Sequence, residues 1–344
     1  MPEAEPTLEQ WRRLYEVAGR VKEAAPWQWM FETDLFALQD PRTGELGFVS
    51  VMGNLGEHLA VANYPRAEGF YGFWLMATGN ERNVEEEFFM LPQLQASFED
   101  RDQLNKRDRD LIGALGLKYR GKGAWPLFRS YRPGYLPWHL EAPEADLLYW
   151  TLEQLLEVAP RFQGLARPDW ARIPTEYPLR VPAVEGEAVT WHDSVAPAPD
   201  QPHREVVIDL APGLLESVRR VGHGLREIEV DLSPQPFVVG ERGQRPQVPF
   251  MLMAVEVQSG MVLSTDLLTA ERGIEAMYEE APGRLLGTMA RLGVRPATIA
   301  VRNWRLEFVL GQVAPAIGAK LARKKQLPAL DRVSRELERF MGRR

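Results

Sequence analysis

The chain has 344 residues, 45% of them hydrophobic and 26% charged, which is the composition of an ordinary globular protein with room for two domains. It contains no cysteine, and this excludes disulfides, thiolate metal sites and cysteine nucleophiles. The acidic N-terminus lacks the apolar core of a signal peptide, and no apolar run approaches the roughly 20 residues that span a bilayer. We therefore expect a cytoplasmic protein without membrane contact.

The net charge of −7 conceals two different halves. Residues 1–191 carry 20 Lys/Arg and 29 Asp/Glu, whereas residues 192–344 carry 21 and 19. Nine of the ten tryptophans also lie in the first half. We predict an aromatic-rich acidic α+β domain over 1–191, an exposed proline-rich linker over 192–204 and a second domain over 205–344.

Two helices of the first domain begin with capping boxes. Thr7 and Gln10 have the spacing in which a hydroxyl accepts from the third backbone N–H while the amide reaches back. Asn105 and Asp108 have the same spacing before a second helical stretch. Apolar residues recur at helical spacing after both pairs, so each pair predicts a helix start.

A hairpin over Leu46–Tyr64 is the expected centre of the first domain. Two apolar runs flank a four-residue turn at 53–56, where Asn54 should be exposed. A strand over Phe31–Leu38 precedes it. A hairpin is stable only against a second layer, and the aromatic helix predicted over 67–77 supplies one.

The second domain alternates strands and helices more regularly. Its predicted strands are Ile228–Leu232, Phe250–Val257, Met261–Leu268, Thr298–Val301 and Ala319–Ala322, and its predicted helices are Glu271–Leu292, Arg305–Ile317 and Pro328–Met341. This order predicts an α+β protein whose second domain is a mixed sheet with helices, in a topology like that of ribonuclease H.

Enzymes of that fold hold two divalent ions with carboxylates on the first strand, the first helix and the end of the fourth strand. Asp231 fits the first place, and Glu275 or Glu279 fits the second. The fourth strand, however, is followed by Arg302 and Asn303. Because two-metal catalysis requires clustered negative charge, Arg302 argues against an active nuclease. We expect Asp231 and Arg302 to pair on neighbouring strands instead.

Three separated phrases, PWQWMFETDLF, FVSVMGNLGEHLAVANY and YRPGYLPWHL, resemble a bacterial family of two-domain proteins of unknown function. The second phrase carries the MGxxGE spelling of its hairpin domain, and the C-terminal half is similar to a companion domain that these proteins carry. The resemblance implies no activity, cofactor or catalytic residue.

Five side chains are candidates for ligand binding. Tyr131, Tyr135 and Trp138 lie in a segment rich in proline and glycine, where aromatic rings are available to stack against a ligand. Packing is the favoured role of these aromatic residues. Glu57 and His58 adjoin the hairpin turn and are candidates for a metal or acid–base pair, but successive strand residues point to opposite faces, which disfavours their convergence. No GxGxxG, P-loop or HExxH pattern is present, so we predict neither a cofactor nor a metal.

Arg323, Lys324 and Lys325 open a basic C-terminal segment that suits an anionic partner such as nucleic acid. The leading prediction is a non-catalytic binding or regulatory protein whose partner, a protein or an anion, the sequence does not identify. The alternatives are a metal-dependent hydrolase or nucleic-acid-processing enzyme that uses carboxylates, and a nucleic-acid-binding protein. Whether the protein is an enzyme stays open.

Overall fold

The protein forms two compact units. In the computed structural model, Met1–Arg132 with Pro137–Pro202 form the first unit, and Pro133–Leu136 with His203–Arg344 form the second. The structure describes residues 4–78, 90–165, 172–186, 188–202, 207–222 and 224–341. Both units combine helices with a sheet, which confirms the predicted two-domain α+β fold. Within those residues, no helix is both long and apolar enough to cross a membrane.

The first unit is built on a seven-stranded sheet in the order β5-β4-β3-β2-β1-β6-β7. Its elements are α1 (Leu8–Ala24), η1 (Pro26–Gln28), β1 (Phe36–Gln39), β2 (Leu46–Met52), β3 (Ala60–Pro65), α2 (Arg66–Ala77), β4 (Gln93–Glu99), η2 (Arg101–Gln103), α4 (Lys106–Ala114), β5 (Trp125–Tyr131), α5 (Ala142–Val158), η3 (Ala159–Phe162), β6 (Glu176–Glu185) and β7 (Ala188–Pro197). Neighbouring strands are antiparallel except β1 and β6, which are parallel.

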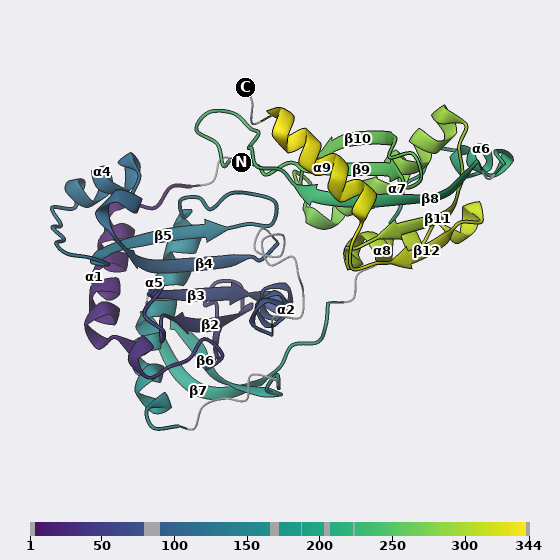
Figure 1. The fold of residues 1–344 in the computed structure, drawn as a ribbon. Helices are drawn as coiled ribbons and strands as arrows, with labels where there is room; N and C mark the ends of the chain where they lie inside the picture. Colours follow the sequence, from purple (N-terminus) through teal and green to yellow (C-terminus); the bar gives the residue numbers. More distant parts are fainter. Residues whose placement is uncertain are drawn as a thin grey trace. The chain divides into compact units, whose positions relative to one another are not determined.

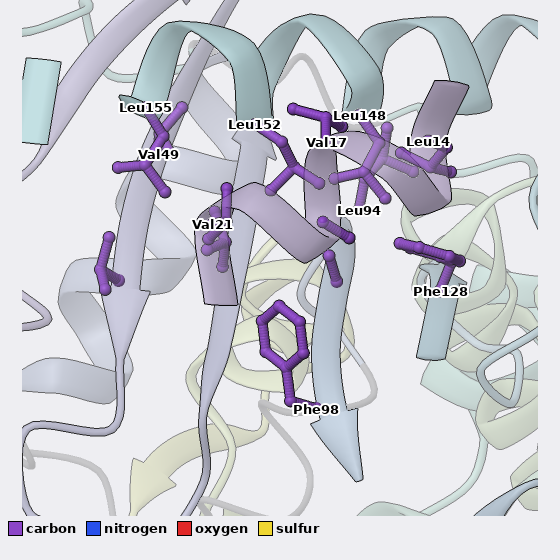
Figure 2. Close-up of a cluster of buried hydrophobic side chains, with 14 of the residues drawn as sticks. Leu14, Val17, Val21, Val49, Leu94, Phe98, Phe128, Leu148, Leu152 and Leu155 are labelled. Carbon is purple, nitrogen blue, oxygen red and sulfur yellow. The ribbon is translucent and has the colours of Figure 1, made fainter. Parts of the chain in front are cut away.

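Helices cover both faces of this sheet (Figure 1). The helices α1 and α5 pack on one face, and α2 packs on the other, where Phe70, Phe73 and Trp74 meet the strands. Figure 2 shows the core of the first face, in which side chains of α1, α5 and the sheet interlock: Leu14, Val17, Val21, Leu148, Leu152, Leu155, Val49, Leu94, Phe98 and Phe128. Because the central strands are covered on both sides, they are buried along almost their whole length.

The central hairpin is present, but its connection differs from the prediction. Val51 and Val61 face each other fully buried, as expected of core residues. The last paired residues are Met52 and Ala60, so the loop runs over 53–59 rather than over four residues. Asn54 is half-buried because its amide donates to the carbonyl of Trp27 at 3.1 Å.

Two further predictions of local structure are corrected. The strand predicted over Phe31–Leu38 begins only at Phe36, because the Phe31 N–H donates to the Asp34 carboxylate at 2.8 Å and forms a turn. The chain stays in β7 through Pro197, within the segment predicted to be an exposed linker. Pairing with β6 buries Ala196 in this segment. The part of the predicted linker that is free of regular structure therefore begins after Pro197.

The second unit contains a five-stranded sheet in the order β10-β9-β8-β11-β12. Its elements are α6 (Leu214–Arg220), β8 (Leu225–Pro234), β9 (Phe250–Glu256), β10 (Val262–Leu268), α7 (Ile274–Leu292), β11 (Pro296–Val301), α8 (Trp304–Gly311), η4 (Pro315–Ile317), β12 (Lys320–Arg323) and α9 (Pro328–Met341). Strand β9 is antiparallel to both of its neighbours, whereas β8, β11 and β12 are mutually parallel. The single helix predicted over Arg305–Ile317 is divided into α8 and η4.

A short segment between β5 and α5 belongs to the second unit. Within Pro133–Leu136, the carbonyl of Gly134 accepts from the N–H of Val248 at 2.9 Å. Gly134 has φ +80°, and a Cβ there would lie 2.3 Å from the Cβ of Ala270. Glycine is therefore required by both the backbone conformation and the close approach.

Candidate functional site

The first unit has a cavity of about 330 Å³ that is open to solvent on one side. It lies between the start of α1, the helix α4, the strand β5 and His139 in the segment between β5 and α5. Its walls are formed by Glu5, Pro6, Leu8, Trp11, Tyr15, Arg107, Asp108, Asp110, Leu111, Ala114, Phe128 and His139. The volume is at the lower end of the range of small-molecule sites, so the cavity is the candidate functional site of this unit.

Local sequence positions the helices that border the cavity. Both predicted capping boxes are confirmed: Thr7 with Gln10 starts α1, and Asn105 with Asp108 starts α4. The side chain of Gln10 also donates to the carbonyl of Ala142 at 3.2 Å, which joins the start of α1 to the start of α5. The capping interactions therefore fix helix ends as well as the walls of the cavity.

The polar wall of the cavity includes Asp108, which forms a buried ion pair. The guanidinium of Arg129 donates to both carboxylate oxygens of Asp108 at 2.9 and 2.6 Å. The side chains are only 14% and 8% exposed, so the pair is held largely away from water. The same carboxylate also accepts from the N–H of Asn105 at 3.0 Å. Asp108 thus has its acceptor capacity used by partners in the fold.

His139 stands beside this pair. Its Nδ1 lies 3.8 Å from a carboxylate oxygen of Asp108, and its side chain is 12% exposed. Burial, together with the positive charges of Arg107 and Arg129, lowers the pKa of His139 to about 4. The ring is therefore neutral at pH 7, with one nitrogen donating and the other accepting.

Aromatic side chains complete the inner wall. The rings of Tyr15 and Phe128 meet edge to face with centroids 4.9 Å apart, and the ring of Trp11 lies 6.1 Å from that of Phe128. All three residues are at least nine-tenths buried. Burial raises the pKa of the Tyr15 phenol, so it stays protonated. Sequence patterns did not single out these residues, because their spacing is that of ordinary core positions.

The charged side chains at the mouth of the cavity are paired within the protein. Arg107 contacts the Glu5 carboxylate at 3.1 Å, and Lys106 donates to Asp110 at 2.5 Å. Both pairs are largely exposed, so each contributes little to stability. Each pair combines one positive and one negative side chain, so the two pairs add no net charge at the mouth of the cavity.

Two of the residues predicted to bind a ligand meet in a different network. The Tyr131 hydroxyl donates to the side-chain Oε1 of Gln95 at 2.6 Å, and the side-chain Nε2 of Gln95 lies 3.0 Å from Nε2 of His58. Nδ1 of His58 is 3.6 Å from the Glu99 carboxylate. Glu57 is exposed in the loop beside His58. The linking residue, Gln95, is buried in β4, and it carried no signal in the sequence.

The other two predicted residues have separate positions. Tyr135 belongs to the second unit, in which it pairs with Gln247. Trp138 belongs to the first, where it pairs with Ser130 and its ring lies edge-on to that of His139. Tyr135 and Trp138 are half-buried rather than exposed. Of the predicted set, Trp138 is thus the one in ring contact with a residue of the cavity wall.

A second cluster of charged side chains lies in the second unit. Asp231 is on β8, and Arg302 directly follows the neighbouring strand β11. Arg302 donates to Asp231 at 2.8 Å and to Asp331 at 2.8 Å, which confirms the expected pair. Burial raises the pKa of Asp231, and the contact with Arg302 opposes that rise. Asp331, in the first turn of α9, was missed because its partner is 29 residues away.

The remaining acids of this unit do not join the cluster into a metal site. Glu279 of α7 accepts from the N–H of Val207 at 3.3 Å. Asn303 caps α8 and donates to the Tyr278 hydroxyl at 3.0 Å. In the part of the chain that the structure describes, no three His, Asp or Glu side chains converge in a way that would hold a metal ion.

The basic segment near the C-terminus is largely neutralised. Arg323 lies 3.5 Å from a Glu307 carboxylate oxygen, and Lys324 donates to Glu227. Lys325 is exposed. Two of the three cations proposed for nucleic-acid binding therefore already have acidic partners in the fold.

These features define a two-domain α+β protein with a lined cavity in one domain and a carboxylate pair bridged by arginine in the other. Residues 11–173 match the family described as a domain of unknown function, DUF7309, and residues 215–338 match the family described as a domain of unknown function, DUF6930. The chain thus combines two such domains, which confirms the resemblance to a two-domain family. Neither description assigns an activity. No curated protein and no solved structure matches the chain.

Proposed function

We propose that the protein is a non-catalytic binding protein that holds a small ligand in the cavity of its first unit. The observation that carries the proposal is a cavity of about 330 Å³ with aromatic walls and the largely buried side chain of His139 beside them. Ligand sites are mostly apolar and contain few, well-placed polar groups. The wall formed by Trp11, Tyr15 and Phe128, with His139 beside it, has this composition.

The chemistry of the polar groups supports binding rather than catalysis. A general base works best when its pKa lies near the operating pH, whereas the pKa of His139 is lowered to about 4. The Asp108 carboxylate is held by Arg129 and by a backbone N–H, so it has little capacity to take a proton from a substrate. These groups suit a fixed hydrogen-bonding wall.

A cavity-filling variant tests the proposal. Ala114 lies in the wall at the end of α4, and Ala114→Leu introduces a helix-compatible side chain into the space. We expect ligand-observed NMR with a fragment library to give hits on the wild-type protein that disappear in Ala114→Leu. Gly113→Leu is the matched control, because it adds the same side chain next to Ala114, where a Cβ has no neighbour within 4 Å. A library without hits sensitive to Ala114→Leu contradicts the proposal.

For the second unit we propose a ribonuclease-H-like scaffold that has no metal-dependent activity. The support is the strand order β10-β9-β8-β11-β12 with β9 antiparallel, and Arg302 between Asp231 and Asp331. A guanidinium at this place repels divalent ions and satisfies the carboxylates that would bind them. Purified protein should leave single- and double-stranded DNA and RNA intact with magnesium or manganese. Cleavage that is lost in Asp231→Asn would contradict this proposal.

The boundaries of the domains are also a proposal: a first domain over 1–191, a linker over 192–204 whose residues up to Pro197 are paired in β7, and a second domain over 205–344. Support comes from the end of β7 at Pro197 and from the division of the chain after Pro202. Limited proteolysis should cut between these two residues before it cuts the hairpins. Early cleavage within Leu46–Tyr64 instead would contradict the proposed boundaries.

We also propose that the protein works in the cytoplasm. The support is the absence of cysteine, which suits a reducing compartment. Fractionation of cells that express the full chain tests this, and recovery in a membrane or secreted fraction would contradict it.

A further inference from the structure

We infer that the cavity of the first unit selects an uncharged, aromatic small molecule and discriminates against the charged analogues of that molecule. This inference rests on the proposed binding function and specifies its ligand class. It follows from the pairing of charges around the cavity and from the composition of its inner wall.

The charges nearest the cavity are already compensated. Asp108 is bound by Arg129 through two hydrogen bonds of 2.9 and 2.6 Å. At the mouth, Arg107 pairs with Glu5 at 3.1 Å, and Asp110 pairs with Lys106. A charged ligand would have to separate one of these pairs or remain without a counter-ion, and a charge moved out of water without a partner is strongly disfavoured. An uncharged ligand incurs neither cost.

The inner wall favours an aromatic ring. Trp11, Tyr15 and Phe128 already interact in tilted and edge-to-face arrangements, with centroid separations of 4.9 to 6.4 Å. A further ring in the cavity extends the same geometry, because aromatic pairs prefer edge-to-face and offset contacts. The cavity of about 330 Å³ is large enough for a one- or two-ring molecule.

His139 supplies the polar contact that an uncharged ligand needs. As a neutral imidazole, it has one donor and one acceptor nitrogen, so it can bind a ligand N–H or O–H without burying a net charge. A protonated histidine would favour anions instead. The lowered pKa of His139 therefore agrees with the balance of charge at the mouth.

Three probes that share one ring system test the inference: indole, indole-3-acetate and tryptamine, which are neutral, anionic and cationic at pH 7. Binding to the full chain is measured by ligand-observed NMR titration, with Ala114→Leu as the reference for binding outside the cavity. We expect indole to bind at least tenfold more tightly than either charged probe. Equal or tighter binding of a charged probe, lost in Ala114→Leu, overturns the inference and leaves the proposed binding function intact.

A charge-releasing variant provides an independent readout. Glu5 is exposed, and Glu5→Gln leaves Arg107 without its carboxylate partner while the fold is maintained. We expect this variant to bind indole-3-acetate several-fold more tightly than the wild type does, so that the preference for indole over indole-3-acetate becomes smaller. Unchanged binding of indole-3-acetate overturns the claim that charge pairing sets the selectivity. The absence of any probe or library hit that depends on Ala114 overturns the proposed function itself.

Discussion

Replacement of Asp108 by Asn tests the buried pair at the polar wall of the cavity. The variant keeps the size of the side chain but removes the negative charge that faces Arg129. The two hydrogen bonds of 2.9 and 2.6 Å are charge-assisted, and such bonds contribute about 1.5–3 kcal/mol each. Asn retains one acceptor oxygen, so part of the free energy that these two hydrogen bonds contribute is retained. Because both partners are less than 15% exposed, we expect a loss of about 3 kcal/mol, within the range of about 3–5 kcal/mol for breaking a buried pair.

The same helix offers a matched control. Asp110 lies one half-turn from Asp108 and pairs with Lys106, but both of these side chains are mostly exposed. Exposed pairs spaced four residues apart on a helix contribute about 0.3–0.5 kcal/mol. Asp110→Asn should therefore cost several times less than Asp108→Asn. The two variants change the same atoms on one helix, so the comparison measures what burial, the two bonds from Arg129 and the capping bond from Asn105 together add at Asp108.

Urea unfolding at pH 7, followed by tryptophan fluorescence, is a suitable assay because nine of the ten tryptophans lie in residues 1–191. The signal therefore reports on the first unit. A second variant, Asp108→Leu combined with Arg129→Met, replaces the pair by apolar side chains and should recover most of the lost stability. Equal costs for Asp108→Asn and Asp110→Asn, or a double variant less stable than Asp108→Asn, would refute the assigned role of the pair.

Three further outcomes are expected. Arg302→Met should destabilise the second unit by about 3 kcal/mol or more in calorimetry, because it leaves the buried Asp231 carboxylate without its partner. Arg302→Asp should not create metal-dependent cleavage of nucleic acid. Gly134→Ala should lower the melting temperature of this unit far more than Gly260→Ala, since both have positive φ but only Gly134 would clash; equal shifts would contradict the packing argument. The folded-state pKa of His139, about 4, is below the ordinary 6.5, so the unfolded chain binds an extra proton between these values. The first unit should thus lose up to roughly 3 kcal/mol as pH falls from 6.5 to 4, and urea titrations of His139→Gln should lack this contribution.

Local sequence determined much of the secondary structure. The capping pairs Thr7–Gln10 and Asn105–Asp108 identify helix starts because the hydrogen bonds involved join residues three apart. The central hairpin was also accessible from local sequence, because a short continuous apolar run is the pattern of a strand that is buried on both faces. Even the contact of Asp231 with Arg302 was accessible, because strand order placed both residues on neighbouring strands.

The tertiary structure decided the candidate site. The cavity combines α1, α4, β5 and His139, and no short-range pattern indicates that these segments share a wall. Likewise, the parallel contact of β6 with β1 joins two strands that are far apart in the sequence. The segment Pro133–Leu136 joins the second unit although its neighbours in sequence belong to the first. Helix caps and the apolar runs of strands are encoded within a few residues. Cavities and ion pairs depend instead on packing between distant segments. In this protein, that packing alone brings Asp108, Arg129 and His139 together.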